Sequence, residues 1–100
     1  PVLQDPELLA VMQAETSALI IKSFAEELKH LESFDADSIK SCFTRLMKET
    51  KVKGKAAFEP VRIALTAVTH GPGLYDMIAL FGKEKAVKRV EDALADCSDN

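Results

Sequence analysis

The stretch Asp35-ADSIKSCFTRLMKE-Thr50 decides the fold class of this 100-residue chain. Asp35 and Asp37 lie at its start, where carboxylates accept hydrogen bonds from unpaired backbone N–H groups and complement the helix dipole. The stretch therefore predicts an amphipathic α-helix with one buried side. Its apolar residues recur at positions i, i+3, i+4, i+7 and i+8 of one helical face, and they are Ile39, Cys42, Phe43, Leu46 and Met47.

The N-terminal part shows the same helical spacing. Asp5-Pro6 combines a capping residue with a proline at the first helical position, which predicts a short helix to about Gln13. Thr16 or Ser17 is expected to cap a second helix that ends near Ser33. The apolar stripe of this second helix follows steps of four, four and three, at Ile20, Phe24, Leu28 and Leu31.

Glycines divide the C-terminal half into three further helices. Gly54 precedes a fourth helix, in which we expect Pro60 to lie in the opening turn, where backbone N–H groups lack partners. The turn Gly71-Pro72-Gly73, with two residues free to adopt positive φ, separates it from a short helix over residues 74–81. Gly82 then allows a last helix to about residue 96. The apolar stripes of the fourth and last helices are Phe58, Val61, Leu65 and Val68, and Ala86, Val87, Val90 and Leu94.

No stretch shows the sustained apolar and polar alternation that is typical of an exposed strand. The prediction is an all-α fold, a compact bundle of about five to six helices. We expect residues 1–100 to form one domain, with residues 1–14 as the tail of, or the link to, a preceding subdomain. Upstream sequence is expected too, because Pro1 is not an initiator and no signal-peptide pattern follows it.

The location is predicted to be cytoplasmic. The longest strongly apolar stretch, residues 18–21, is four residues long, whereas crossing a bilayer takes roughly 20. Cys42 and Cys97 occur without a CxxC motif or a neighbouring group of histidines, which indicates neither a zinc site nor a disulfide framework. Free thiols are typical of a reducing compartment.

Charge is unevenly distributed along a chain whose net charge is −3. Residues 40–90 hold eleven bases and four acids, whereas residues 1–39 carry a balance of −6 and residues 91–100 a balance of −4. A local basic field can attract phosphate even when the whole chain is acidic. We expect the basic region to form one connected surface, away from the acidic segments; the alternative is an ordinary solvated surface. The candidate phosphate contacts are Lys51, Lys53 and Lys55.

The sequence contains no phosphate-binding glycine loop, nucleophile elbow or metal-binding helix motif. His30 and His70 are isolated, and the neighbouring acids Glu26-Glu27 are explained better as helix surface than as paired catalytic carboxylates. We therefore predict no catalytic residue, no metal ligand and no cofactor within the chain.

The corner between residues 58 and 81 offers a different kind of chemistry. It combines Arg62, His70 and a glycine-rich turn, and such a corner can hold single-stranded bases. Arginine presents five donors and a planar face for stacking, while a glycine turn exposes backbone groups to base edges. The alternative is that Arg62 bridges Glu59 and that the turn only connects two helices.

The stretch Lys51-VKGKAAFEPVRIALTAVTHGPGLYDMIALFGKEKAVKRVEDAL-Ala95 resembles the final helices of bacterial-type glutamyl-tRNA synthetases, which are class I enzymes. The matching parts keep their order and spacing, and residues 15–50 are similar in helical layout. These parts are Gly54-Lys55, Pro60-Val61-Arg62, Ala64-Leu65-Thr66, Gly71-Pro72-Gly73-Leu74 and Leu80-Phe81-Gly82-Lys83-Glu84.

The resemblance implies an α-helical cage that holds the anticodon bases of glutamate tRNA. Arg62 matches the family arginine that contacts the first two bases, and the segment Gly71, Pro72, Gly73 and Leu74 matches the loop that reads the first base, largely through main-chain groups. Some members carry threonine in place of Gly71, so main-chain readout is the part that carries over. Tyr75 and His70 are candidates for base stacking, and Tyr75 is alternatively a packing residue.

The resemblance also implies what lies elsewhere. The HIGH-type and KMSKS-type catalytic motifs are missing, so the glutamate, ATP and magnesium sites and the arginine for the third base are expected outside this chain. The implied partners are tRNA and the catalytic domain of the same polypeptide, with neither DNA nor membrane. The alternatives are an independent enzyme and a helical DNA-binding or protein-interaction domain, although the fourth helix lacks the cluster of Arg, Asn or Gln typical of a DNA-reading helix.

Overall fold

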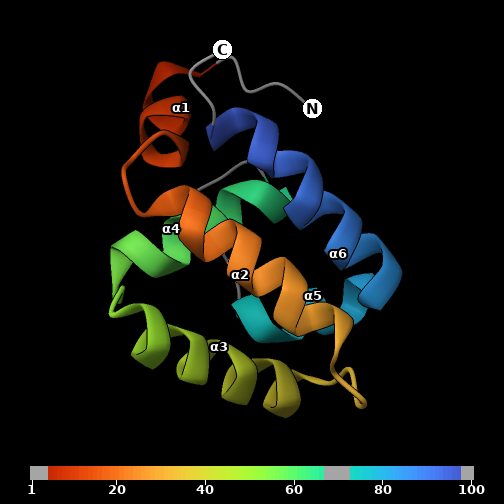
Figure 1. Ribbon diagram of the computed structural model, residues 1–100. Coiled ribbons are helices and arrows are strands. Elements are labelled where there is room, and N and C mark those ends of the chain that lie inside the picture. Colours follow the sequence, from red (N-terminus) through yellow and green to blue (C-terminus); the bar gives the residue numbers. More distant parts are fainter. Residues whose placement is uncertain (1–4, 67–72, 98–100) are drawn as a thin grey trace.

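The computed structural model describes residues 5–66 and 73–97, and these ranges contain helices and no strand (Figure 1). The prediction of an all-α bundle is confirmed. Six α-helices and a short 3₁₀ helix follow one another as α1 Pro6–Met12, α2 Ser17–Lys29, α3 Ala36–Thr50, α4 Lys55–Thr66, α5 Leu74–Phe81, α6 Lys83–Asp92 and η1 Ala93–Cys97.

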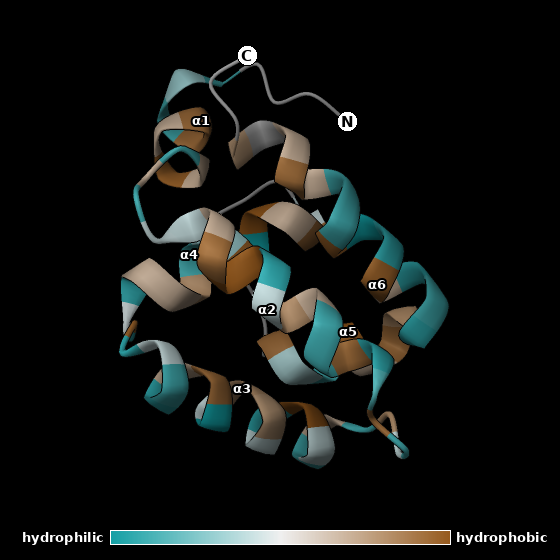
Figure 2. Cartoon of the chain, in the orientation of Figure 1, coloured by the Kyte–Doolittle hydropathy of each residue, from teal (hydrophilic) through white to brown (hydrophobic). Residues whose placement is uncertain are grey.

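Helix α2 lies at the centre of the bundle. It packs against α3, α4 and α6, while α5 packs on α3 and α6 (Figure 1). Hydrophobic residues lie on the side of α3 that faces the other helices, as the hydropathy colouring of the ribbon in Figure 2 shows. Helices α2 and α3 thus each bury one stripe, as the periodicity predicts, whereas α4 buries Ala57, Pro60 and Ile63 besides Val61 and Leu65 of its predicted stripe. Val68 of that stripe lies outside the described residues.

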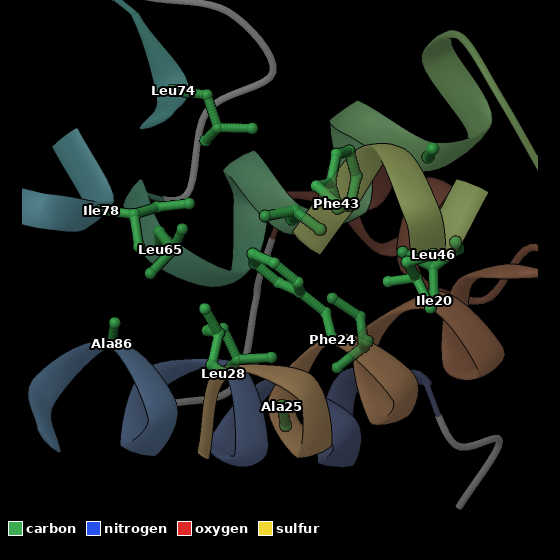
Figure 3. Packing of buried hydrophobic residues seen from close by; sticks show 14 of the residues in the cluster. Ile20, Phe24, Ala25, Leu28, Phe43, Leu46, Leu65, Leu74, Ile78 and Ala86 are labelled. Carbon is green, nitrogen blue, oxygen red and sulfur yellow. The ribbon is translucent and has the colours of Figure 1, made fainter. Parts of the chain in front are cut away.

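The core joins side chains from α1 to α6, and Figure 3 labels members from α2 to α6. Its largest fully buried side chains include Met12, Ile20, Ile21, Phe24, Leu28, Ile39, Phe43, Leu65 and Ile78. Three aromatic rings pack around that of Phe43. The ring centroids of Phe24 and Phe43 are 5.1 Å apart, those of Phe43 and Phe58 are 5.2 Å apart, and those of Phe43 and Tyr75 are 6.3 Å apart, all edge to face.

The predicted caps of α1 and α3 are confirmed. Asp5 accepts a hydrogen bond from the backbone N–H of Glu7 at 2.9 Å, and Asp35 accepts one from Ser38 at 2.8 Å. The bond from Ser38 lowers the pKa of Asp35, because it stabilises the charged carboxylate.

Helix α2 differs from the prediction at both ends. Its N-cap Thr16 makes no side-chain capping bond, and the buried Ser17 hydroxyl instead donates to the Val11 carbonyl, which ties α1 to α2. The helix ends at Lys29 rather than near Ser33, because the N–H of His30 turns back to the Glu27 carbonyl, three residues earlier. Such i to i−3 bonds tighten and close a helical turn.

Two predictions about the C-terminal half are wrong. Helix α4 begins at Lys55, so Pro60 lies in its second turn and not in the opening turn. Pro60 is buried, and burial of its ring offsets part of the cost of the missing N–H. The last helix also changes character, because α6 ends at Asp92 and the chain continues to Cys97 as 3₁₀ helix.

Within the described ranges no single helix is long and apolar enough to cross a membrane, and only α1 and α2 taken together, with a 70° bend between them, reach the required length and composition.

Candidate nucleic-acid interface

Helices α4 and α5 carry two of the predicted site residues. Arg62 lies half-buried on α4, and Tyr75 lies half-buried in the first turn of α5. Burial raises the pKa of Tyr75, and the positive charge of Arg62 is near enough to oppose that rise. The last turn of α4 is fixed by the Thr66 hydroxyl, which donates to the Arg62 carbonyl at 2.8 Å.

Tyr75 belongs partly to the core and partly to the surface. Its ring contacts Phe43 edge to face, yet the side chain remains only half-buried. A ring held in this way offers a fixed aromatic surface, and such surfaces are what unstacked bases bind. Packing by Tyr75 is therefore observed, and stacking on RNA stays a prediction.

The predicted reading loop ends in one exposed residue and one buried side chain. Gly73 is exposed, but the side chain of Leu74 is 4% exposed and packs in the core, so only main-chain groups of Leu74 are placed for contact with a base. The φ of Gly73 is −45°, so our expectation of positive φ there is wrong. The nearby Asp76 carboxylate would lie 3.1 Å from a Cβ atom at Gly73. Predictions for His70, Gly71 and Pro72 fall outside the described residues.

The three predicted phosphate-contact lysines lie around the start of α4. Lys51 caps α3 in the left-handed conformation with φ 61°, Lys53 follows it in the connector, and Lys55 begins α4. All three are exposed, and among the residues that the structure describes none has a carboxylate within 4.0 Å. Lys55 and Arg62 are seven residues apart, which places them on nearly the same side of the helix, about 10 Å apart along its axis.

The outer face of α3 carries two lysines that the sequence analysis did not single out. Lys40 and Lys48, with Ser41, Thr44 and Arg45, line a shallow hollow along the helix. Neither lysine has an ion-pair partner among the described residues. Lys40, Thr44 and Lys48 follow one another at intervals of four residues, and this spacing in the sequence could have predicted that the two lysines share one side of α3.

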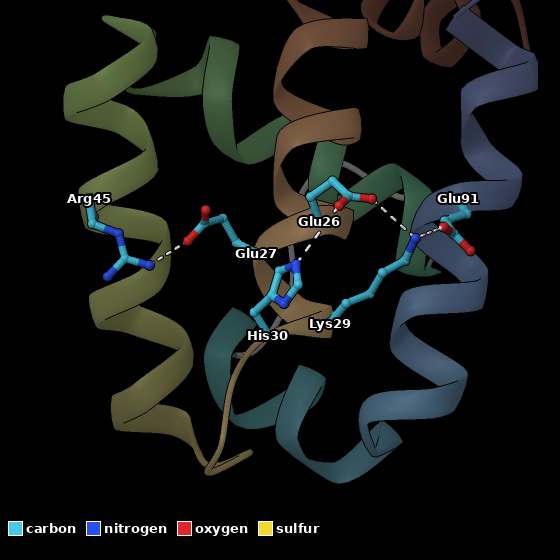
Figure 4. Close-up of polar contacts among 6 residues, drawn as sticks. All are labelled: Glu26, Glu27, Lys29, His30, Arg45 and Glu91. Carbon is cyan, nitrogen blue, oxygen red and sulfur yellow. Dashed lines mark hydrogen bonds and ion pairs between the residues drawn. The ribbon is translucent and has the colours of Figure 1, made fainter.

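The acidic segments meet the basic region more closely than predicted (Figure 4). Glu27 of α2 pairs with Arg45 of α3, so the expectation that acidic and basic segments lie apart is wrong at this point. Lys29 pairs with Glu91 at 2.6 Å and with Glu26 at 3.2 Å, which raises the pKa of Lys29. Between α2 and α6, Lys29 is therefore held in ion pairs, whereas Lys40 and Lys48 on α3 have no such partner among the described residues.

Side chains that bind metals do not gather in the described part of the chain. It contains no group of three or more His, Cys, Asp or Glu residues that could hold a metal ion. Cys42 is a buried free thiol whose pKa burial raises to about 11, and Cys97 is half-buried. His30 is exposed, with Nε2 4.0 Å from the Glu26 carboxylate.

The sequence profile of the anticodon binding domain family matches residues 2–94. The chain belongs to this family. It is also homologous to part of several glutamate–tRNA ligases. It is 43% identical over 84 residues to the enzyme of Desulfitobacterium hafniense, 39% over 92 residues to that of Latilactobacillus sakei, and 42% over 86 residues to that of Bacillus subtilis.

These matches cover 84%, 92% and 86% of this anticodon binding domain but only 17%, 19% and 18% of the three relatives. The chain therefore spans less than a fifth of the length of the curated relatives that it matches. The matched region includes both Arg62 and Tyr75, and the resemblance to this family is confirmed.

Proposed function

We propose that this anticodon binding domain reads the anticodon of glutamate tRNA on behalf of a glutamate–tRNA ligase. The observation that carries the proposal is that Arg62 and Tyr75 lie on helices that both pack around Phe43, in a chain homologous to part of such ligases. A guanidinium supplies directed donors to a base edge, and a fixed ring supplies a stacking surface.

Each candidate residue has a role in the proposal. Arg62 contacts the first two anticodon bases, and Gly73 and Leu74 present main-chain groups to the first base, together with Gly71 and Pro72. Main-chain readout agrees with the burial of the Leu74 side chain. Tyr75 and His70 are the proposed stacking residues.

The lysines supply the contact with the RNA backbone. Lys51, Lys53 and Lys55 bind phosphates on one side of Arg62, and Lys40 and Lys48 extend the same basic surface along α3. Ammonium groups without carboxylate partners can neutralise phosphate, and they position RNA without reading its sequence.

The rest of the ligase would supply the chemistry. We propose that residues 1–100 are one domain, that residues 1–14 link it to a preceding part, and that Met12, which is fully buried, anchors that link. Catalytic residues, ATP, magnesium and recognition of the third base would belong to other parts of the same cytoplasmic polypeptide.

Binding to an anticodon stem-loop of glutamate tRNA tests the proposal. Arg62→Ala should lose roughly 1–3 kcal/mol on the matched stem-loop and much less on one altered at the first or second anticodon base. Lys53→Ala should weaken both equally, because a phosphate contact is indifferent to sequence. Lys22→Ala, an exposed lysine of α2 that is not among the proposed phosphate contacts, is the matched control and should change neither.

Salt dependence gives an independent check. With about three single-strand phosphates neutralised, log K should fall against log salt with a slope of roughly −2. Equal affinity for duplex DNA, or an Arg62→Ala loss that is the same for matched and altered anticodons, would overturn the proposal.

A further inference from the structure

A guanidinium from α6 binds a backbone carbonyl of α4. Nη1 of Arg89 donates a hydrogen bond to the carbonyl oxygen of Leu65 at 2.7 Å, which joins residues 24 positions apart. Leu65 lies in the last described turn of α4, one turn after Arg62. This bond therefore ties α6 to α4 near Arg62.

The same guanidinium lies over the last aromatic ring of α5. Cζ of Arg89 is 4.9 Å from the centroid of Phe81, and Nζ of Lys85 is 5.0 Å from that centroid. An arginine can stack on a ring with its flat face while its edge donates to a carbonyl. Lysine, with a compact ammonium group, cannot make both contacts in this way. Arg89 thus touches the end of α4 and the end of α5 at once.

This double contact matters because α4 and α5 carry the two recognition residues. Each of these helices packs on α6 more extensively than on the other. Arg62 lies one turn before Leu65 on α4, and Tyr75 lies near the start of the eight-residue helix α5. Helix α6 is therefore one of the helices through which the position of α4 relative to α5 is set, and Arg89 is the residue of α6 that contacts both.

We propose that Arg89 is a positioning residue that fixes Arg62 and Tyr75 relative to each other and thereby sets anticodon selectivity. Arg89 contacts no base in this proposal, and it acts through Leu65 on α4 and through Phe81 on α5. The consequence for RNA binding rests on the proposed function, whereas the consequence for the protein does not.

The test compares Arg89→Lys and Arg89→Met with Lys88→Met. Lys88 is the neighbouring exposed residue of α6 and pairs only with Asp92 at 3.2 Å among the described residues, so its loss controls for charge. Arg89→Lys should weaken binding of the matched glutamate stem-loop about tenfold, the equivalent of one hydrogen bond to a charged group, and hardly affect a base-altered stem-loop. Lys88→Met should leave the ratio of the two affinities unchanged. Helix content by circular dichroism confirms that each variant is folded.

A second measurement needs no RNA. Tyr75 is the single tyrosine of a chain without tryptophan, so intrinsic fluorescence reports on the recognition corner alone. Both Arg89 variants should change that emission, and Lys88→Met should not. If folded Arg89→Lys keeps the selectivity and the emission of the unaltered chain, Arg89 does not position the corner. If the unaltered chain fails to discriminate anticodons, the proposed function fails, and the emission of the Arg89 variants still decides whether this residue positions Tyr75.

Discussion

Replacing Phe43 with leucine should lower the free energy of unfolding by about 2–3 kcal/mol. Phe43 is fully buried and makes edge-to-face contacts with Phe24, Phe58 and Tyr75. One such pair contributes about 0.5–1.5 kcal/mol beyond its buried area, so three pairs set an upper limit of about 4.5 kcal/mol. Leucine retains much of the apolar burial, which places the expected loss below the roughly 3–5 kcal/mol of a Phe→Ala change.

Thermal and urea unfolding, followed by circular dichroism, measure this loss. For a domain of this size, about 1 kcal/mol corresponds to a midpoint shift of about 4–8 °C, so Phe43→Leu should lower the midpoint by about 10–20 °C. Phe34→Leu is the matched control, because Phe34 packs on the core while half-buried and takes part in none of the three ring pairs. Equal losses from the two variants would refute the assignment of stability to the ring contacts.

Three further predictions concern local features. A bond from Ser38 lowers the pKa of Asp35 below its ordinary 3.8. The folded state therefore gains stability above pH 3.8 and loses it as the pH falls through the folded-state pKa. Asp35→Asn should remove this part of the acid dependence of the urea midpoint. Cys42, with its pKa raised to about 11, should resist iodoacetamide at pH 8 until denaturant is added, and rapid alkylation of the folded chain, followed by mass spectrometry, would contradict its burial. Lys51→Gly should raise the free energy of unfolding by roughly 1 kcal/mol, since glycine tolerates the left-handed φ of 61°. The same change should weaken binding to the stem-loop. If both stability and affinity rise, Lys51 does not contact a phosphate.

The sequence predicted the helices best where a cap and an apolar stripe agreed. The capping bond of Asp35 and the buried face of α3 appear as expected, and α5 has the predicted bounds because Gly82, with φ 84°, ends it. Helix α2 ended early because its closing bonds, such as that of His30 to Glu27, depend on backbone geometry that an apolar stripe does not record.

The sequence predicted which residue types form the candidate site, but not which of their side chains are buried or paired. Leu74 follows a glycine turn, and only packing shows that its side chain belongs to the core. Arg45 and Lys48 count equally as bases of residues 40–90 in the sequence, yet in the structure Glu27 from another helix pairs with Arg45. Contacts between distant helices decide such matters, and for the same reason the bond of Arg89 to Leu65 was invisible in the sequence.

The ring contacts of Phe43 have a consequence for how relatives of this domain can diverge. Phe43 contacts both the buried Phe24 and the half-buried Tyr75, so a change in ring size at Phe43 alters the position of the Tyr75 ring. Interiors are packed densely enough that even one methylene is felt by the neighbours. A change at Phe43 should therefore be followed by a compensating change at Tyr75, and these two positions should covary among relatives that keep the same tRNA. In relatives that bind another tRNA, these positions should lose their covariation only where other core residues have changed as well.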